Sequence, residues 1–200
     1  MMEDQDTDPR LRGRPITPAE LKALAHPLRI QLLELLMDEG PSTASHLGRT
    51  VGESSGTTSY HLRRLAAAGL ITEASDVGTG RDRYWRAVSG WSLESDLIQG
   101  RDTRRDARIV LDEVVRTNIR RMQTWYRDSE TWPDEWREAS IGATTRLVLT
   151  PAQLRELGDE LLLLIDRYRQ AQHSTGTVGT AKVVVQADIF PTGQPEDVPG

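Results

Sequence analysis

The chain has 200 residues, of which 37% are hydrophobic and 28% charged, and its formal net charge is -5. No apolar run approaches the roughly 20 residues that span a bilayer, and the charged N-terminus lacks the pattern of a signal peptide, so we expect a cytoplasmic protein without a membrane partner. The sequence contains no cysteine, which excludes disulfides, thiolate metal sites and cysteine nucleophiles.

The first part of the chain predicts an arm followed by two helices. Residues 1–16 mix acids and arginines without periodicity and are expected to be disordered. The stretch TPAE at 17–20 is a capping box with proline at the first helical position, and it opens a short helix through Leu24. His26 is expected to cap a second, strongly apolar helix that ends near Gly40.

Two further short helices follow, joined by a tight turn. Ser42 is placed to cap the third helix, which ends near Gly52, and Ser54 is placed to cap the fourth, which ends at Gly69. A pair of short helices with a polar second member is a helix-turn-helix pattern.

A predicted β-hairpin comes directly after these helices. The segments LITEAS and RYWRAV read as short strands, and the turn-rich DVGTGRD lies between them. Three helices, a fourth polar helix and a hairpin, in this order, predict a winged helix-turn-helix domain over residues 17–91.

The fourth helix has two chemically different faces. Thr58, His61, Leu62 and Leu65 fall on one side at helical spacing and are expected to face the core. The other side carries short hydroxyl side chains and then arginines, which suit close approach to a DNA groove and pairing with phosphates or guanine edges. A solvated helix beside a charged turn is the alternative. The candidate DNA contacts are Ser55, Thr57, Ser59, Tyr60, Arg63 and Arg64, with Arg81 and Arg83 in the hairpin.

The segments ALAHPLRIQLLELL, SSGTTSYHLRRLAAAGLI and GRDRYWRAV together resemble the DNA-binding domain of ArsR-type (arsenical-resistance repressor) bacterial regulators. The resemblance covers roughly residues 17–89. It implies that residues 54–68 are a recognition helix and that the protein is a homodimer binding an imperfect palindrome in double-stranded DNA. The contacts it implies are Ser55, Thr57, Ser59, Tyr60 and Arg63.

The sequence also departs from that family. Its metal-sensing members carry a cysteine pair on the third helix, where this chain has Thr43 and Ser45. The four histidines lie far apart without ligand spacing. We therefore expect neither a metal nor a cofactor, and His61 is expected to pack at the edge of the core.

A long helix of about 26 residues is predicted after Arg101. Its spacing of four and three residues places apolar side chains and one asparagine along a single seam, which favours a homodimer, while packing within the chain is the alternative reading. The residues of this predicted dimerisation seam are Leu111, Val115, Asn118 and Met122.

The last part of the chain predicts a small helix and strand module, which with the long helix covers residues 101–190. TTRLVLT at 144–150 and AKVVVQADIF at 181–190 read as strands, and a second capping box at Thr150 opens the helix between them. Residues 191–200 are expected to be a flexible tail. The predicted fold class is α+β and mainly helical, and the whole chain resembles regulators common in actinobacteria that carry such an extension.

Four aromatic side chains gather near the end of the long helix. They would suit a small apolar or anionic organic effector, although packing in a small core is the more frequent role of such residues. They are Trp125, Tyr126, Trp132 and Trp136.

These patterns favour a DNA-binding transcriptional regulator, expected to be a homodimeric repressor of a palindromic operator that responds to a signal other than thiol chemistry. A winged-helix scaffold for protein interactions is the alternative. The sequence has no GxSxG, HExxH or glycine-rich phosphate loop, and we expect no enzyme activity or catalytic residue.

Overall fold

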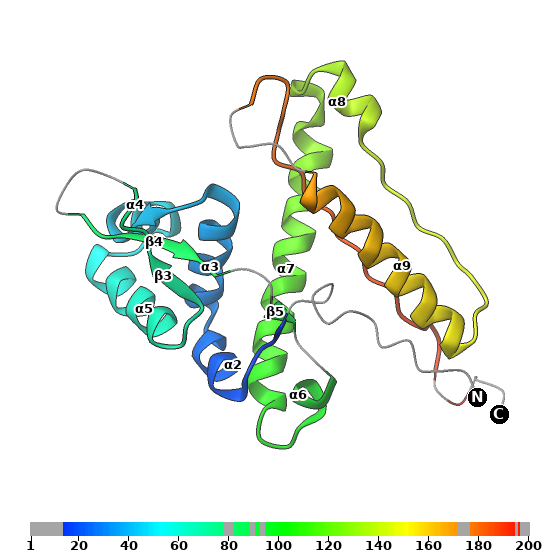
Figure 1. Ribbon diagram of the computed structural model, residues 1–200, viewed down its shortest axis with the longest axis horizontal. Helices are drawn as coiled ribbons and strands as arrows, with labels where there is room; N and C mark the ends of the chain where they lie inside the picture. Colours follow the sequence, from blue (N-terminus) through cyan, green and yellow to red (C-terminus); the bar gives the residue numbers. More distant parts are fainter. Residues whose placement is uncertain are drawn as a thin grey trace. The chain divides into compact units, whose positions relative to one another are not determined.

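A computed structural model describes residues 14–77, 82–88, 91–92, 95–171, 177–194 and 196 (Figure 1). Its contacts divide the chain into two compact units, with a boundary in the sequence between Ser129 and Glu130. The predicted turn glycines Gly78 and Gly80, and Arg81 beside them, lie outside the described residues, as do residues 1–13 of the predicted arm.

Four helices form the body of the first unit: α2 (Pro18–Leu24), α3 (Pro27–Glu39), α4 (Ala44–Val51) and α5 (Ser55–Ala67). The predicted capping box is present, because Glu20 N donates to Thr17 Oγ1 and Thr17 N donates to Glu20 Oε2, at 3.2 and 2.8 Å. His26 caps α3 as predicted, its Nδ1 accepting from Leu28 N at 3.2 Å.

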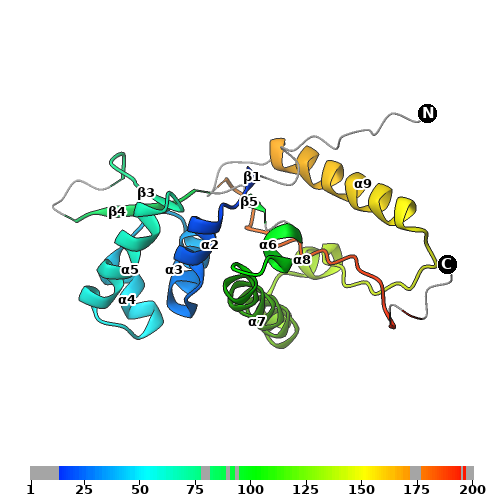
Figure 2. The ribbon, with the colours of Figure 1, turned by 90° about the horizontal axis from the view of Figure 1, so that it is seen from below.

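A three-stranded antiparallel sheet packs on one side of these helices (Figure 2). The predicted hairpin is confirmed as β3 (Ile71–Glu73) and β4 (Tyr84–Ala87), with Thr72 opposite Arg86. A further strand, β2 (Ser42–Thr43), pairs with the other edge of β4. The prediction that Ser42 caps α4 was wrong: Ser42 pairs with Trp85, and Thr43 Oγ1 accepts from His46 N at 3.2 Å instead.

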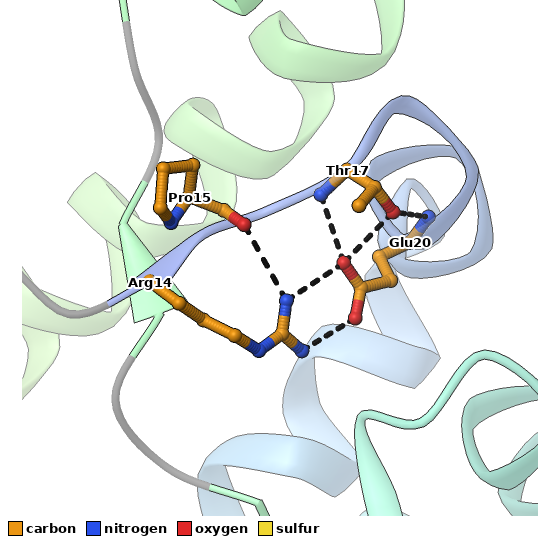
Figure 3. A network of polar contacts seen from close by, with 4 residues as sticks. All are labelled: Arg14, Pro15, Thr17 and Glu20. Carbon is orange, nitrogen blue, oxygen red and sulfur yellow. Dashed lines mark hydrogen bonds and ion pairs between the residues drawn. The ribbon is translucent and has the colours of Figure 1, made fainter.

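The end of the predicted arm is ordered. β1 (Arg14–Pro15) pairs in parallel with β5 (Trp91–Ser92), and Ile16 is 2% exposed. Arg14 Nη1 and Nη2 donate to the two carboxylate oxygens of Glu20 at 2.9 and 2.5 Å, and Nη1 also donates to Pro15 O (Figure 3). This guanidinium lowers the pKa of Glu20 to about 2. Disorder through residue 16 was therefore a wrong prediction, because residues 14–16 gain a strand partner, an ion pair and a core position.

The long helix α7 (Arg104–Asp128) follows the short α6 (Ser95–Gln99) and packs on α2 and α3. Its Ala107 and Val110 are buried in the same core as α2, α3 and α5. Its packing places α7 in the first unit, whereas the sequence placed the module boundary near residue 101. The core of this unit consists of Ile16, Leu21, Leu24, Ile30, Leu32, Leu33, Leu36, Leu47, Leu62, Leu65, Leu70, Ile71, Trp85, Leu97, Ala107 and Val110.

Two polar links hold α7 to α3. Arg121 donates to Glu34 and Asp38 at 2.5 and 2.7 Å. Glu113 is only 3% exposed, accepts from Gln31 at 3.3 Å, and forms an ion pair with Arg116 at 2.5 Å. These links fix both the rotation of α7 and its axial position on α3.

The second unit contains α8 (Asp134–Ala139) and α9 (Pro151–Gln170), preceded by the 3-10 turn η1 (Ser129–Thr131). Thr150 and Gln153 form the predicted capping box of α9. The described residues of 141–150 and 177–194 contain no strand, so the strands predicted at 144–150 and 181–190 were wrong. A strand requires a hydrogen-bonded neighbour, and these extended segments instead expose apolar side chains such as Val148 and Val183.

Candidate nucleic-acid interface

The turn between α4 and α5 is tight because two glycines shape it. Gly52 ends α4 with φ 75°, a left-handed conformation that favours glycine, and Glu53 N donates to Gly48 O at 2.8 Å. A Cβ on Gly48 would lie 2.8 Å from Glu53 O and 3.0 Å from Thr58 Oγ1. Gly48 therefore allows the two helices to approach closely. Sequence reasoning missed this role, and its one signal was a glycine inside a helical segment.

The inner face of α5 is the one that the sequence predicts. Ser54 Oγ accepts from Thr57 N at 3.1 Å and caps the helix. Thr58 is fully buried and its hydroxyl donates to Ser54 O at 2.9 Å, while Leu62 and Leu65 enter the core. With this face buried, the helix presents its opposite side to solvent.

The predicted contact residues of α5 lie together on that exposed side. Tyr60 is 53% exposed, and the arginines at 63 and 64 are exposed. Arg63 Nε donates to Ser59 O at 3.2 Å, one turn back along the helix. Ser55 is exposed as well, whereas Thr57 and Ser59 are half-buried.

Two arginines in the described part of the hairpin, Arg83 and Arg86, have acidic partners. Arg83 Nε lies 3.2 Å from Glu73 Oε2 and its guanidinium lies over the Trp85 ring, 5.6 Å from the centroid. Arg86 pairs with Asp76 at 2.7 Å. The positive charge of the described hairpin is thus partly offset, whereas no acidic side chain in the described part of the chain pairs with Arg63 or Arg64.

Two histidines meet behind the exposed face of α5. His61 is 8% exposed, its ring centroid lies 4.6 Å from that of His26, and Tyr60 packs edge-on against it at 5.2 Å. Burial lowers the pKa of His61, and the charges of His26 and Arg29 lower it further. The prediction that His61 packs at the core edge is confirmed, and its neutral ring supports Tyr60 from behind.

The seam predicted on α7 is not covered within its unit. Val115 and Met122 are about half exposed, and Leu111 and Asn118 are partly exposed. Ile119 and Tyr126 extend the apolar stripe, at 44% and 66% exposure. The packed side of α7 is the neighbouring one, which carries Ala107, Val110 and Glu113.

The aromatic residues predicted for an effector are divided between the two units. Trp125 and Tyr126 belong to α7, whereas Trp132 and Trp136 belong to the second unit, where their rings meet edge to face at 6.2 Å. A groove of the first unit is formed instead at α3 and α7 by Pro27, Gln31, Glu113, Arg116, Ile119, Arg120 and Gln123. No group of three metal-ligating side chains occurs within the described residues.

Comparison with known proteins matches residues 24–74 to a family described as a helix-turn-helix domain. The chain is also 40% identical over 58 residues to the HTH-type transcriptional regulator YgaV of Escherichia coli (strain K12). That alignment covers 29% of this chain and 59% of the relative's length. No helix among the described residues is both long enough and apolar enough to span a membrane.

Proposed function

We propose that this protein is a transcriptional regulator that binds double-stranded DNA in a sequence-specific manner, with α5 as the recognition helix. The observation that carries the proposal is the exposed face of α5, which combines short hydroxyl side chains, Tyr60 and two arginines that pair with no acidic side chain among the described residues. The match of residues 24–74 to a helix-turn-helix family supports it. The similarity to a relative named as a transcriptional regulator points the same way.

The chemistry of this face suits a major groove. Ser55 and Ser59 are small enough to let the helix backbone approach base edges, and Arg63 can donate two parallel hydrogen bonds to a guanine. Arg64 and the Tyr60 hydroxyl suit phosphates, which fix the register of the helix on the duplex. Arg83 would reach DNA by exchanging Glu73 for a phosphate.

A homodimer formed through α7 is part of the proposal. The exposed stripe of Leu111, Val115, Asn118 and Met122 has the spacing of a helix that packs on a second copy. Two copies related by a twofold axis would present two α5 helices to half-sites about one duplex turn apart, as a palindromic operator requires. The intrachain alternative is less favourable for these four residues, since α7 already packs on α3 through the neighbouring side that carries Ala107, Val110 and Glu113.

We further propose that the regulator acts as a repressor that a small organic molecule releases. The support is chemical: the edge-to-face pair Trp132 and Trp136 presents aromatic surface, with Trp132 40% exposed. Such surface suits an apolar or aromatic effector.

The decisive experiment is binding of the full chain to the promoter fragment upstream of its own gene, measured at several salt concentrations against a scrambled fragment of equal length. Sequence-specific recognition predicts tighter binding to the promoter and a linear fall of log K with log salt. Arg63→Ala should reduce the preference for the promoter, whereas Arg105→Ala on α7 serves as a charge-matched control. Equal binding to both fragments at all salt concentrations would leave a winged-helix protein scaffold as the better reading.

A further inference from the structure

Arg29, which lies outside α5, interacts electrostatically with residues on the exposed face of α5. Arg29 is the third residue of α3, and α3 packs against α5. Burial lowers the pKa of Arg29, the positive charge of Arg64 lowers it further, and Tyr60 acts in the opposite direction. The groups that act electrostatically on Arg29 thus include two residues of the proposed recognition helix.

The polar contacts of Arg29 are incomplete. Its Nε is buried and has no hydrogen-bond partner, and among the described residues only one other buried side-chain atom, His61 Nδ1, shares this condition. Its Nη2 donates one long bond, 3.5 Å, to Lys22 O at the surface. A buried donor without a partner is destabilising unless a ligand or water satisfies it.

Among the described residues neither Arg29 nor Arg64 has a counter-ion, whereas several other arginines of the unit do. The arginines at positions 14, 83, 86 and 121 each pair with a carboxylate. No ion pair within the described ranges joins an acidic side chain to Arg29 or Arg64. Two like charges held close without an acid are a repulsion that a bound anion would relieve.

We infer that Arg29, with Tyr60 and Arg64, forms a phosphate-binding site that grips the DNA backbone beside the bases that α5 reads. This inference rests on the proposed function and adds a contact from α3 to it. The Arg29 guanidinium would donate to a phosphate oxygen in the fork geometry typical of arginine, and the Tyr60 hydroxyl would donate to a second oxygen. Because a phosphate carries no base identity, the site would add affinity and register without adding sequence preference.

The test compares Arg29→Met, Arg29→Lys and the control Arg105→Met, each in the full chain. Methionine keeps an apolar stem of similar length and removes the charge. We expect Arg29→Met to bind promoter and scrambled DNA about tenfold more weakly, to the same extent for both, and to lower the slope of log K against log salt by about 0.9. Arg29→Lys should keep most of the salt slope, and Arg105→Met should behave like the unmodified chain.

The free protein supplies a second readout. Since Arg29 and Arg64 repel each other without DNA, Arg29→Met should leave thermal stability unchanged or raise it. A wild-type affinity and salt slope for Arg29→Met would overturn the inference, as would a loss of affinity confined to the promoter fragment. A lower melting temperature that accounts for the lost binding would also overturn it. Failure of the unmodified chain to prefer its promoter is a different result, and it would remove the proposed function itself.

Discussion

The imidazole rings of His26 and His61 lie 4.6 Å apart at an interplanar angle of 45°, where the first turn of α3 meets α5. His26 Nδ1 accepts the capping hydrogen bond of α3 from Leu28 N, and His61 Nδ1 is buried without a hydrogen-bond partner in the part of the chain that the structure describes. Burial lowers the pKa of both rings, which favours their neutral form. Protonating either one would add a charge beside Arg29, with Glu53 as the acid that acts on His61.

This pair predicts an acid-sensitive stability. Burial lowers the pKa of both histidines in the folded protein below their ordinary value of about 6.5. The unfolded chain then binds more protons, so the free energy of unfolding should be constant above about pH 6.5 and fall as the pH drops through the folded pKa values. Urea unfolding from pH 8 to pH 5 measures this. His61→Gln should flatten the decrease, whereas His46→Gln, a substitution at a surface residue, should leave it in place.

Gly48 predicts a contrast between two glycine-to-alanine changes. Gly48→Ala forces a methyl group against Glu53 O and should destabilise the first unit by about 1–3 kcal/mol. Gly158→Ala, in α9, meets no atom within 4 Å and should stabilise its helix by about 0.5–1 kcal/mol. Thermal unfolding followed by circular dichroism compares the two. Equal effects of the same sign would show that the approach of α4 and α5 is not set by Gly48.

Arg121 predicts how firmly α7 is held to α3. Its side chain is 26% exposed and bonds both Glu34 and Asp38, so Arg121→Met should lower the free energy of unfolding by about 1–2 kcal/mol. Arg127 pairs with its neighbour Asp128 and is 68% exposed, so Arg127→Met should change stability by less than about 0.5 kcal/mol. Denaturant unfolding of both variants provides the comparison. If the Arg121 variant is as stable as the Arg127 variant, the bridge contributes little.

The exposed stripe of α7 predicts the oligomeric state. Met122→Glu places a charge in the centre of the proposed interface and should shift the protein from dimer to monomer, because a charge buried without a partner is strongly destabilising. Gln123→Glu adds the same charge one position away, off the stripe. Light scattering after size-exclusion chromatography measures the mass of each variant. A monomeric unmodified chain, or a Met122 variant that remains dimeric, would contradict an interface through this stripe.

The parts of the fold that were predicted correctly depend mostly on residues close together in the sequence. The capping residues Thr17, Ser54 and Thr150 act on atoms within one helical turn, so sequence spacing alone identifies them. Ser42 was misassigned because its partner, Trp85, is distant in sequence. The strands expected at 144–150 and 181–190 are absent for a related reason. β-branched residues favour an extended backbone, but they do not identify the neighbouring strand that a sheet requires.

The candidate site likewise contains some residues that the sequence predicted and others that it did not. The two sides of α5 follow from helical period, and the structure confirms the predicted buried side of Thr58, His61, Leu62 and Leu65. Arg29 and Gly48 were missed because their roles depend on the contacts of α3 and α4 with α5, which no short window of sequence contains. The dimerisation role of the seam stays a prediction that Met122→Glu tests, and the effector role of the aromatic residues stays a prediction.

The pairing of β1 with β5 has a consequence for how the chain folds as it is synthesised. Arg14 of β1 aligns with Trp91 of β5. During synthesis β1 therefore has no strand partner until the helices and the hairpin between the two strands have left the ribosome. Closing so long a loop is slow compared with forming the local helices. The ion pair of Arg14 with Glu20 needs only six more residues, and it can hold β1 near α2 until β5 has been synthesised.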